Sequence, residues 1–187
     1  MRDAEKLSNK IEIRISGLGG QGVVLAGQIL GRAAVYDGKN AVQTQSYGAE
    51  ARGSAAKSEV IISDGRIGFP SVRKYDMLIA MSQTAVDKHL KDLKENGVLI
   101  VDSNMVQKIP ETKANFFKIQ ASEIAEKTFG AKIYGNMVML GALTGLTKAV
   151  SKESVIKAIK ETVSVKTVKT NLNAFEKGLT LVAEMLS

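Results

Sequence analysis

The sequence predicts an α/β fold with a mainly parallel, twisted sheet, helices on both faces and a helical C-terminal third. Three observations predict it. An alternating strand runs through a glycine-rich turn into a helix, two short apolar runs flank another helical stretch, and helical patterns dominate the last third. No composition shift or linker divides the 187 residues, so residues 1–187 are expected to form a single α/β domain.

The first half of the chain contains three predicted strands and one helix. Residues 11–16 alternate apolar and polar side chains and meet the glycine turn at 17–22, and a helix is expected at 23–36, with Gly38 as its stop signal. Residues 40–45 and 58–63 read as strands. The polar, glycine-bearing stretch between them, 46–54, is expected to be a loop.

The second half supplies a further strand–helix–strand unit and then mostly helices. Residues 76–80 and 98–102 are nearly all apolar, which is typical of strands covered on both faces, and residues 83–94 between them read as a helix. A short strand is expected at 115–119. The remaining helices are expected at residues 121–129, 135–146, 152–163 and about 169–186.

Composition excludes several kinds of chemistry. The chain has no cysteine and one histidine, so it cannot hold an iron–sulfur cluster or a thiolate nucleophile by itself, and no metal site or catalytic residue is predicted. The net charge of +7 is spread along the chain without a row of aromatic residues, so no nucleic-acid partner is expected. The charged first residues and the lack of a long apolar segment predict a cytoplasmic protein without membrane contact.

The glycine turn has the spacing Gly17-x-Gly19-x-x-Gly22, with Gly20 and Gln21 between. Between a strand and a helix this spacing is typical of a Rossmann-like fold, where glycines allow a ligand to approach and the helix start attracts phosphate. A dinucleotide site also needs an acidic residue near the end of the next strand, and residues 42–45 contain none. A purely structural role of the glycines in packing therefore remains open.

Two pairs of glycines lie inside predicted helices. Gly27 and Gly31 are four residues apart, as are Gly141 and Gly145. Each glycine costs a helix about 1 kcal/mol relative to alanine, so a close-packed neighbour is expected to compensate. For the first pair that neighbour could be a strand of the sheet or another subunit.

A second unusual segment follows the predicted strand at residues 40–45. Here Ser46, Tyr47, Glu50 and Arg52 crowd one loop, at the sheet edge where open α/β sheets bind their ligands. Tyr47 could stack on a ring, Arg52 could bind phosphate or carboxylate, and Glu50 could accept hydrogen bonds. The alternative is an internal contact between Glu50 and Arg52 in a solvated loop.

Taken together, the segments at residues 15–27, 42–53 and 58–63 closely resemble the gamma subunit of the 2-oxoacid:ferredoxin oxidoreductases. The resemblance continues through later segments and covers nearly the whole chain. The Gln-Ser-Tyr-Gly-Ala-Glu-Ala-Arg-Gly run at 45–53 resembles the 2-oxoglutarate branch, with branched-chain 2-oxoacid and pyruvate enzymes as alternatives. Ser54 departs from the second glycine that usually follows this run.

The resemblance implies a division of labour among subunits. Alpha, beta and delta-type partners are expected to carry thiamine diphosphate, magnesium and 4Fe-4S clusters, while the assembly decarboxylates a 2-oxoacid, transfers the acyl group to coenzyme A and reduces ferredoxin. The chain is not expected to be active alone or to bind a cofactor alone. Self-association is expected when it is isolated, because subunit contacts would leave apolar patches exposed. A freestanding dinucleotide-binding or nucleotide-binding protein is the competing class.

The proposed site combines both motifs. Its residues are expected to form one edge of the coenzyme A approach or of a subunit interface, because a helix start and an arginine both suit anionic groups. They are Gly17, Gly19, Gly20, Gln21, Gly22, Ser46, Tyr47, Glu50 and Arg52. His89, the only histidine, is expected on a solvated helix face without a catalytic role.

Overall fold

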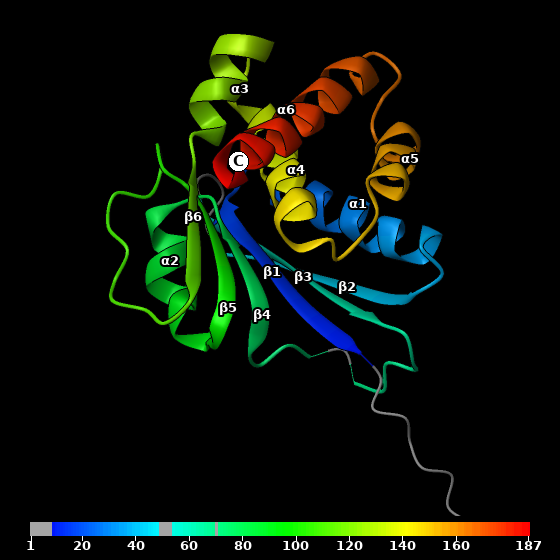
Figure 1. Ribbon diagram of the computed structural model, residues 1–187, viewed down its shortest axis with the longest axis vertical. Helices are drawn as coiled ribbons and strands as arrows, with labels where there is room; N and C mark the ends of the chain where they lie inside the picture. Colours follow the sequence, from blue (N-terminus) through cyan, green and yellow to red (C-terminus); the bar gives the residue numbers. More distant parts are fainter. Residues whose placement is uncertain (1–8, 49–53, 70) are drawn as a thin grey trace, which may run out of the picture.

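The computed structural model describes residues 9–48, 54–69 and 71–187. Strands and helices alternate in the first part, and helices dominate the last third (Figure 1). The strands are β1 (Lys10–Leu18), β2 (Asn40–Tyr47), β3 (Ala55–Ser63), β4 (Tyr75–Ala80), β5 (Leu93–Asp102) and β6 (Asn115–Ile119). The helices are α1 (Val23–Tyr36), α2 (Gln83–His89), α3 (Ala121–Phe129), α4 (Gly135–Thr147), α5 (Lys152–Thr162) and α6 (Val168–Leu186), with short 3-10 turns at Leu90–Asp92 and Lys132–Tyr134.

The six strands of the described residues form one sheet in the order β2-β3-β1-β4-β5-β6. β1, β4, β5 and β6 run parallel, and β3 is antiparallel to both of its neighbours. The predicted mainly parallel sheet is therefore confirmed, with β3 as its exception. The reason is the length of the connection, because the seven residues between β2 and β3 are too few for the crossover that parallel strands need.

Helices cover both faces of this sheet, as predicted (Figure 1). On one face α1 and the C-terminal helices bury a large apolar cluster against side chains such as Ile13, Val60 and Ile100. On the other face α2 and the segment before β4 cover a smaller cluster that includes Leu78 and Leu99. Within the described residues, no helix is both long and apolar enough to cross a membrane.

Several predicted boundaries were wrong. β3 begins at Ala55 rather than at residue 58, and two larger differences lie around α2. The helix predicted at residues 83–94 ends at His89, and β5 begins at Leu93 rather than at residue 98. Leu93 pairs with Tyr75, but the register then shifts, and Asn96 takes a positive φ of 62°. This irregularity interrupts the strand alternation in the sequence, which is why the pattern did not show the strand's start.

The helical glycines find their close-packed neighbours within the chain. A Cβ at Gly27 would overlap the Ser58 hydroxyl of β3, so a sheet strand is its neighbour. Gly141 of α4 faces the Phe175 carbonyl of α6, and Gly178 of α6 faces the Val138 carbonyl of α4, at distances that leave no room for a Cβ. The crossing of α4 and α6 thus depends on a glycine from each helix. Gly31 and Gly145 lie farther from their neighbours.

Candidate functional site

The glycine turn lies between the carboxyl end of β1 and the start of α1. Gly20 and Gly22 have φ values of 92° and 72°, in the left-handed region that side chains disfavour. Nothing lies within 4 Å of the position a Cβ would take at Gly20, so its requirement is conformational. At Gly22 the same Cβ would also overlap the side chain of Asn136. The turn therefore needs glycine at both positions.

Gln21 holds the turn in place. Its Oε1 accepts a hydrogen bond from the Leu18 N–H at 2.6 Å, and its Nε2 donates to the Met81 carbonyl at 2.8 Å, just beyond β4. A Cβ at Gly17 would overlap the Gln21 side chain. Gln21 and Gly17 thus serve the geometry of the turn, a structural role that the sequence did not distinguish from ligand contact.

The structure brings the two predicted motifs together. The Gly19 N–H donates a 2.8 Å hydrogen bond to the carbonyl of Ser54, immediately before β3. β2 runs parallel to β1, because both are antiparallel to β3, so their carboxyl ends share one edge of the sheet. Ser54 makes this contact through its backbone.

The end of β2 differs from the prediction. Ser46 and Tyr47 belong to the strand, because they continue its pairing with Lys57 and Ala56 of β3. Successive strand residues point to opposite faces, so Ser46 and Tyr47 do not share a surface. Tyr47 is 59% exposed and lies on the side of α1, whereas Ser46 is not among the residues that line the cavity there. Glu50 and Arg52 lie outside the described residues.

A cavity of about 380 Å³ adjoins the glycine turn. Tyr47 from β2, Gln28 from α1 and Ile133 from the turn before α4 line it, together with Gly19, Gly20, Gly22 and several apolar residues. Within the described part of the chain no side chain caps the start of α1. Uncapped N–H groups and the helix dipole favour an anionic group, and Tyr47 offers an aromatic surface beside it. This cavity suits a ligand with a phosphate and an aromatic or aliphatic portion.

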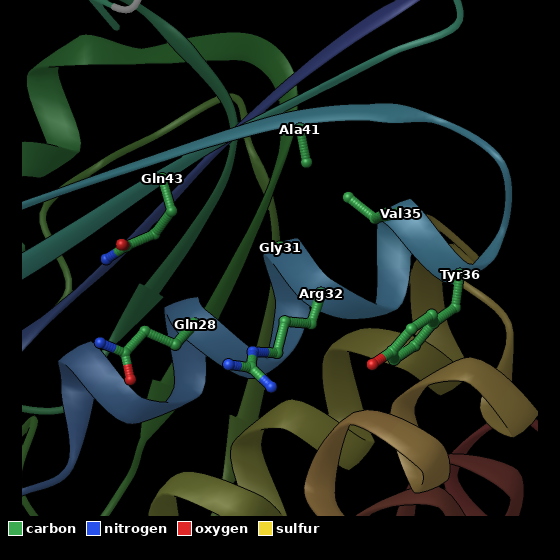
Figure 2. Close-up of a pocket in the computed structure, with 7 residues that line it drawn as sticks. All are labelled: Gln28, Gly31, Arg32, Val35, Tyr36, Ala41 and Gln43. Carbon is green, nitrogen blue, oxygen red and sulfur yellow. The ribbon is translucent and has the colours of Figure 1, made fainter. Parts of the chain in front are cut away.

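A second cavity of about 340 Å³ continues along α1 (Figure 2). It lies between α1 and the edge strand β2, and the close-up shows the side chains of Gln28 and Arg32 on the helix below Gln43 on the strand. Gln28 lines both cavities, so the two adjoin. The glycine turn therefore stands at one end of a groove between α1 and β2.

Gln28, Ile133 and Asn136 were missed by the sequence analysis. Gln28 lies four residues after Val24, so the two share one side of the predicted helix. Helical spacing from the glycine turn could therefore have predicted that Gln28 lies near the site. Asn136 lies 114 residues beyond Gly22, and its Nδ2 donates to the Gly22 carbonyl at 3.1 Å. Only the tertiary fold brings those two segments together, and no local pattern signals the contact.

The prediction that His89 is solvated was wrong. His89 ends α2 half-buried, and its Nδ1 lies 3.0 Å from Nη1 of Arg14. Because a guanidinium only donates, Nδ1 accepts this bond and the ring is neutral. Burial, followed by the nearby charges of Arg14 and Lys57, lowers the His89 pKa to about 4, against the opposing effect of Asp92 and Glu59.

Arg14 is the centre of the polar cluster beneath α2. It forms an ion pair with Glu59 of β3, and its Nε lies 2.9 Å from Glu59 Oε1. The guanidinium stacks on the ring of Tyr75, 4.4 Å from the centroid, and the Tyr75 hydroxyl donates to the His89 carbonyl. Burial raises the Tyr75 pKa to about 12. We call these four side chains the Arg14 cluster: Arg14, Glu59, Tyr75 and His89.

The competing dinucleotide-binding interpretation gains nothing from this geometry. β3 lies between β1 and β2, so the end of β2 is not next to the strand that leads into the glycine turn. No acidic residue occurs in β2, and Gln43, near the expected position, donates to the Ser58 hydroxyl at 2.8 Å. The acid that holds ribose hydroxyls in such proteins therefore has no counterpart on this strand.

Comparisons with known proteins agree with the sequence resemblance. A family model for pyruvate ferredoxin/flavodoxin oxidoreductase matches residues 12–181. The chain is 54% identical to the 2-oxoglutarate synthase subunit KorC of Methanocaldococcus jannaschii, over 93% of this chain and 95% of that protein. The gamma subunit of a keto/oxoacid ferredoxin oxidoreductase from Geobacter sulfurreducens superposes with a TM-score of 0.83 at 47% identity, covering 93% of this chain and 99% of that one.

A larger protein contains the same fold. The 2-oxoglutarate:ferredoxin oxidoreductase of Magnetococcus marinus, solved with 2-oxoglutarate, coenzyme A and succinyl-CoA bound, superposes with a TM-score of 0.83 at 22% identity. The match covers 94% of this chain and 31% of that one. The fold is thus found both as a separate subunit and within a longer chain. On its sequence and its structure, this chain belongs to the pyruvate ferredoxin/flavodoxin oxidoreductase family.

Proposed function

We propose that the chain is the gamma subunit of a 2-oxoglutarate:ferredoxin oxidoreductase. The observation that carries the proposal is its 54% identity, over nearly its full length, to a 2-oxoglutarate synthase subunit. In the proposed reaction 2-oxoglutarate loses carbon dioxide, the succinyl group is transferred to the sulfur of coenzyme A, and two electrons pass to ferredoxin. The branched-chain and pyruvate branches are the alternatives for the substrate.

Within that reaction, the proposed task of this chain is to line the coenzyme A approach. The uncapped start of α1 and the left-handed glycines suit a phosphate group, and Tyr47 stands across the same cavity. Arg52 and Glu50 are proposed to contribute from the segment after β2. A contact with a neighbouring subunit at the same edge would place these residues in an interface instead.

The redox work is proposed to belong to partner subunits. The chain has no cysteine with which to ligate a cluster. The 4Fe-4S clusters are therefore proposed to lie on alpha, beta and delta-type partners. The family resemblance implies the same for thiamine diphosphate and magnesium, and ferredoxin is proposed to be reduced through the assembly. No residue of this chain is proposed to touch the bond that breaks.

The experiment uses the assembled complex with Tyr47→Ala and, separately, Arg52→Ala. If these side chains bind coenzyme A, each variant should raise its KM by about tenfold while the KM for 2-oxoglutarate stays unchanged. Phe116→Ala, which truncates a half-exposed aromatic side chain on β6 at the opposite sheet edge, is the control for Tyr47. Arg73→Ala removes an exposed cation from the segment before β4 and is the control for Arg52.

An unchanged KM for coenzyme A together with unchanged assembly would overturn both versions of the site. Loss of assembly in the two site variants, but not in the controls, would assign these residues to a subunit interface. Turnover of the purified complex with 2-oxoglutarate, branched-chain 2-oxoacids and pyruvate tests the substrate. A preference for either of the last two would overturn that assignment while leaving the subunit's role intact.

A further inference from the structure

Asn136 is an unusual residue for its position. It lies in the first turn of α4, where it is 1% exposed, and the following residues of that helix are apolar and buried. Its Nδ2 donates to the carbonyl of Gly22, the residue that precedes α1. Its Oδ1 has no hydrogen-bond partner among the residues that the structure describes. A buried acceptor without a partner destabilises the fold, and an aliphatic side chain here would avoid that cost.

The position of Asn136 suggests what offsets this cost. Gly22 takes a left-handed conformation, and its carbonyl accepts both the Asn136 amide and the Ala26 N–H of the first turn of α1. The amide therefore fixes the peptide plane at which α1 begins. The orientation of that peptide plane sets the direction of the uncapped N–H groups at the start of α1. These groups lie beside the cavity that Gly22 and Ile133 line.

Resting on the proposed function, we propose that Asn136 is a positioning residue for coenzyme A. It does not touch the reacting atoms. The hydrogen bond from its amide fixes the Gly22 carbonyl. The first N–H groups of α1 then present a preformed site to a phosphate of coenzyme A. Gln21 fixes the other side of the same turn through Leu18 and Met81. The turn is thus held between two amide side chains, one from its own sequence and one from α4.

The test compares Asn136→Ala with Asn171→Ala in the assembled complex. Asn171 is a matched control, because it is 5% exposed on α6 and its Nδ2 also donates to a backbone carbonyl, that of Thr167, at 2.8 Å. Both variants leave a cavity of similar size and lose one hydrogen bond. Asn136→Ala should raise the KM for coenzyme A about fivefold to tenfold, with kcat and the KM for 2-oxoglutarate within twofold. Asn171→Ala should change none of these.

A second measurement keeps the proposal testable if a variant assembles poorly. Hydrogen exchange of the Val23, Val24 and Leu25 amides is followed in the unmodified complex with and without coenzyme A, and then in Asn136→Leu, which is near in size but has no hydrogen-bond donor. Coenzyme A should slow exchange at these amides in the unmodified complex. The Leu variant should exchange faster there without ligand and should show less slowing at the same ligand concentration, because no side chain then holds the Gly22 carbonyl.

The outcomes separate the two proposals. If coenzyme A leaves exchange at residues 23–25 unchanged in the unmodified complex, the proposed coenzyme A site is wrong. If it slows exchange there, and the Asn136 variants keep the unmodified KM and the unmodified exchange, the site stands and the positioning role is overturned. A fall in melting temperature equal to that of Asn171→Ala, without a change in KM, would likewise reduce Asn136 to a packing residue.

Discussion

The two faces of the sheet are stabilised in different ways. The face under α1, α4, α5 and α6 is held by apolar packing, and its closest approach is the glycine contact between α4 and α6. The face under α2 also buries apolar side chains, but there the Arg14 cluster connects three strands with the end of α2. Apolar packing depends on shape, whereas a buried ion pair depends on both partners being present. The two faces should therefore respond to different substitutions and to different conditions.

The largest effect is expected from breaking the ion pair on the α2 face. Glu59→Leu leaves the Arg14 guanidinium buried without its carboxylate, and the side chains of this pair are only 7% and 11% exposed. Such a loss costs about 3–5 kcal/mol, which chemical denaturation would show as a lowered midpoint. The double variant Arg14→Met with Glu59→Leu should recover most of that stability, because no buried charge remains.

An exposed pair provides the control for this prediction. Glu95 and Lys113 lie 3.0 Å apart with both side chains more than 70% exposed, so Glu95→Ala should change the midpoint little. Equal effects of Glu59→Leu and Glu95→Ala would contradict the view that burial makes the Arg14 pair important. If the double variant is as unstable as Glu59→Leu, the lost stability comes from the missing ion pair itself and not from an unpaired charge on Arg14.

A smaller effect is expected from the α4–α6 contact on the other face. Gly141→Ala places a methyl group against the Phe175 carbonyl, so the helices must separate. Overpacking of this kind costs about 1–3 kcal/mol after the gain of alanine in helix propensity, and thermal unfolding would measure it.

Gly145→Ala, one turn along the same helix, is the matched control. Its nearest neighbours would be side-chain atoms of Val182 at 3.2 and 3.4 Å, which can shift slightly, so its stability should change by less than about 1 kcal/mol. If both alanine variants lose the same stability, the backbone contact at Gly141 is not what limits the approach of the helices.

The difference between the faces also explains which predictions from sequence succeeded. α1, α3 and β6 have the predicted bounds. For α1 and α3 the reason is that apolar periodicity and glycine signals directly reflect burial on the larger face. The alternation in β1 indicated only that Arg14 and Ile13 point to opposite faces. It did not reveal which side chains meet Arg14 on that face, so the buried ion pair with Glu59 was not predicted.

The candidate site shows the same limit. The spacing of Gly17, Gly19 and Gly22 located the turn, and the strand order then placed Tyr47 beside it. The contacts of Asn136 with Gly22 and of His89 with Arg14 join residues 114 and 75 positions apart. Such contacts follow from how helices and strands pack, and the residues involved have no periodicity that distinguishes them from other polar positions.

The smallest predicted effect is a loss of stability in mild acid that originates on the α2 face. The folded-state pKa of His89 is lowered to about 4 from its ordinary value of 6.5, mainly by burial and then by Arg14. Between pH 6.5 and 4 the unfolded chain therefore binds a proton on His89, and the folded protein does not. The stabilisation is complete above pH 6.5 and is lost as the pH falls toward 4, by about 1 kcal/mol once solvent screening of a half-buried ring is considered.

Because His89 is the only histidine, a single imidazole resonance reports its titration directly. That resonance should titrate near pH 4 in the folded protein, and denaturation midpoints should fall between pH 6.5 and 4. His89→Gln keeps a side chain that can accept from Arg14 but does not titrate, so its stability should vary less over the same range. A resonance that titrates near 6.5, or an unaltered pH profile in His89→Gln, would mean that the ring is solvated and that the Arg14 cluster ends at Tyr75.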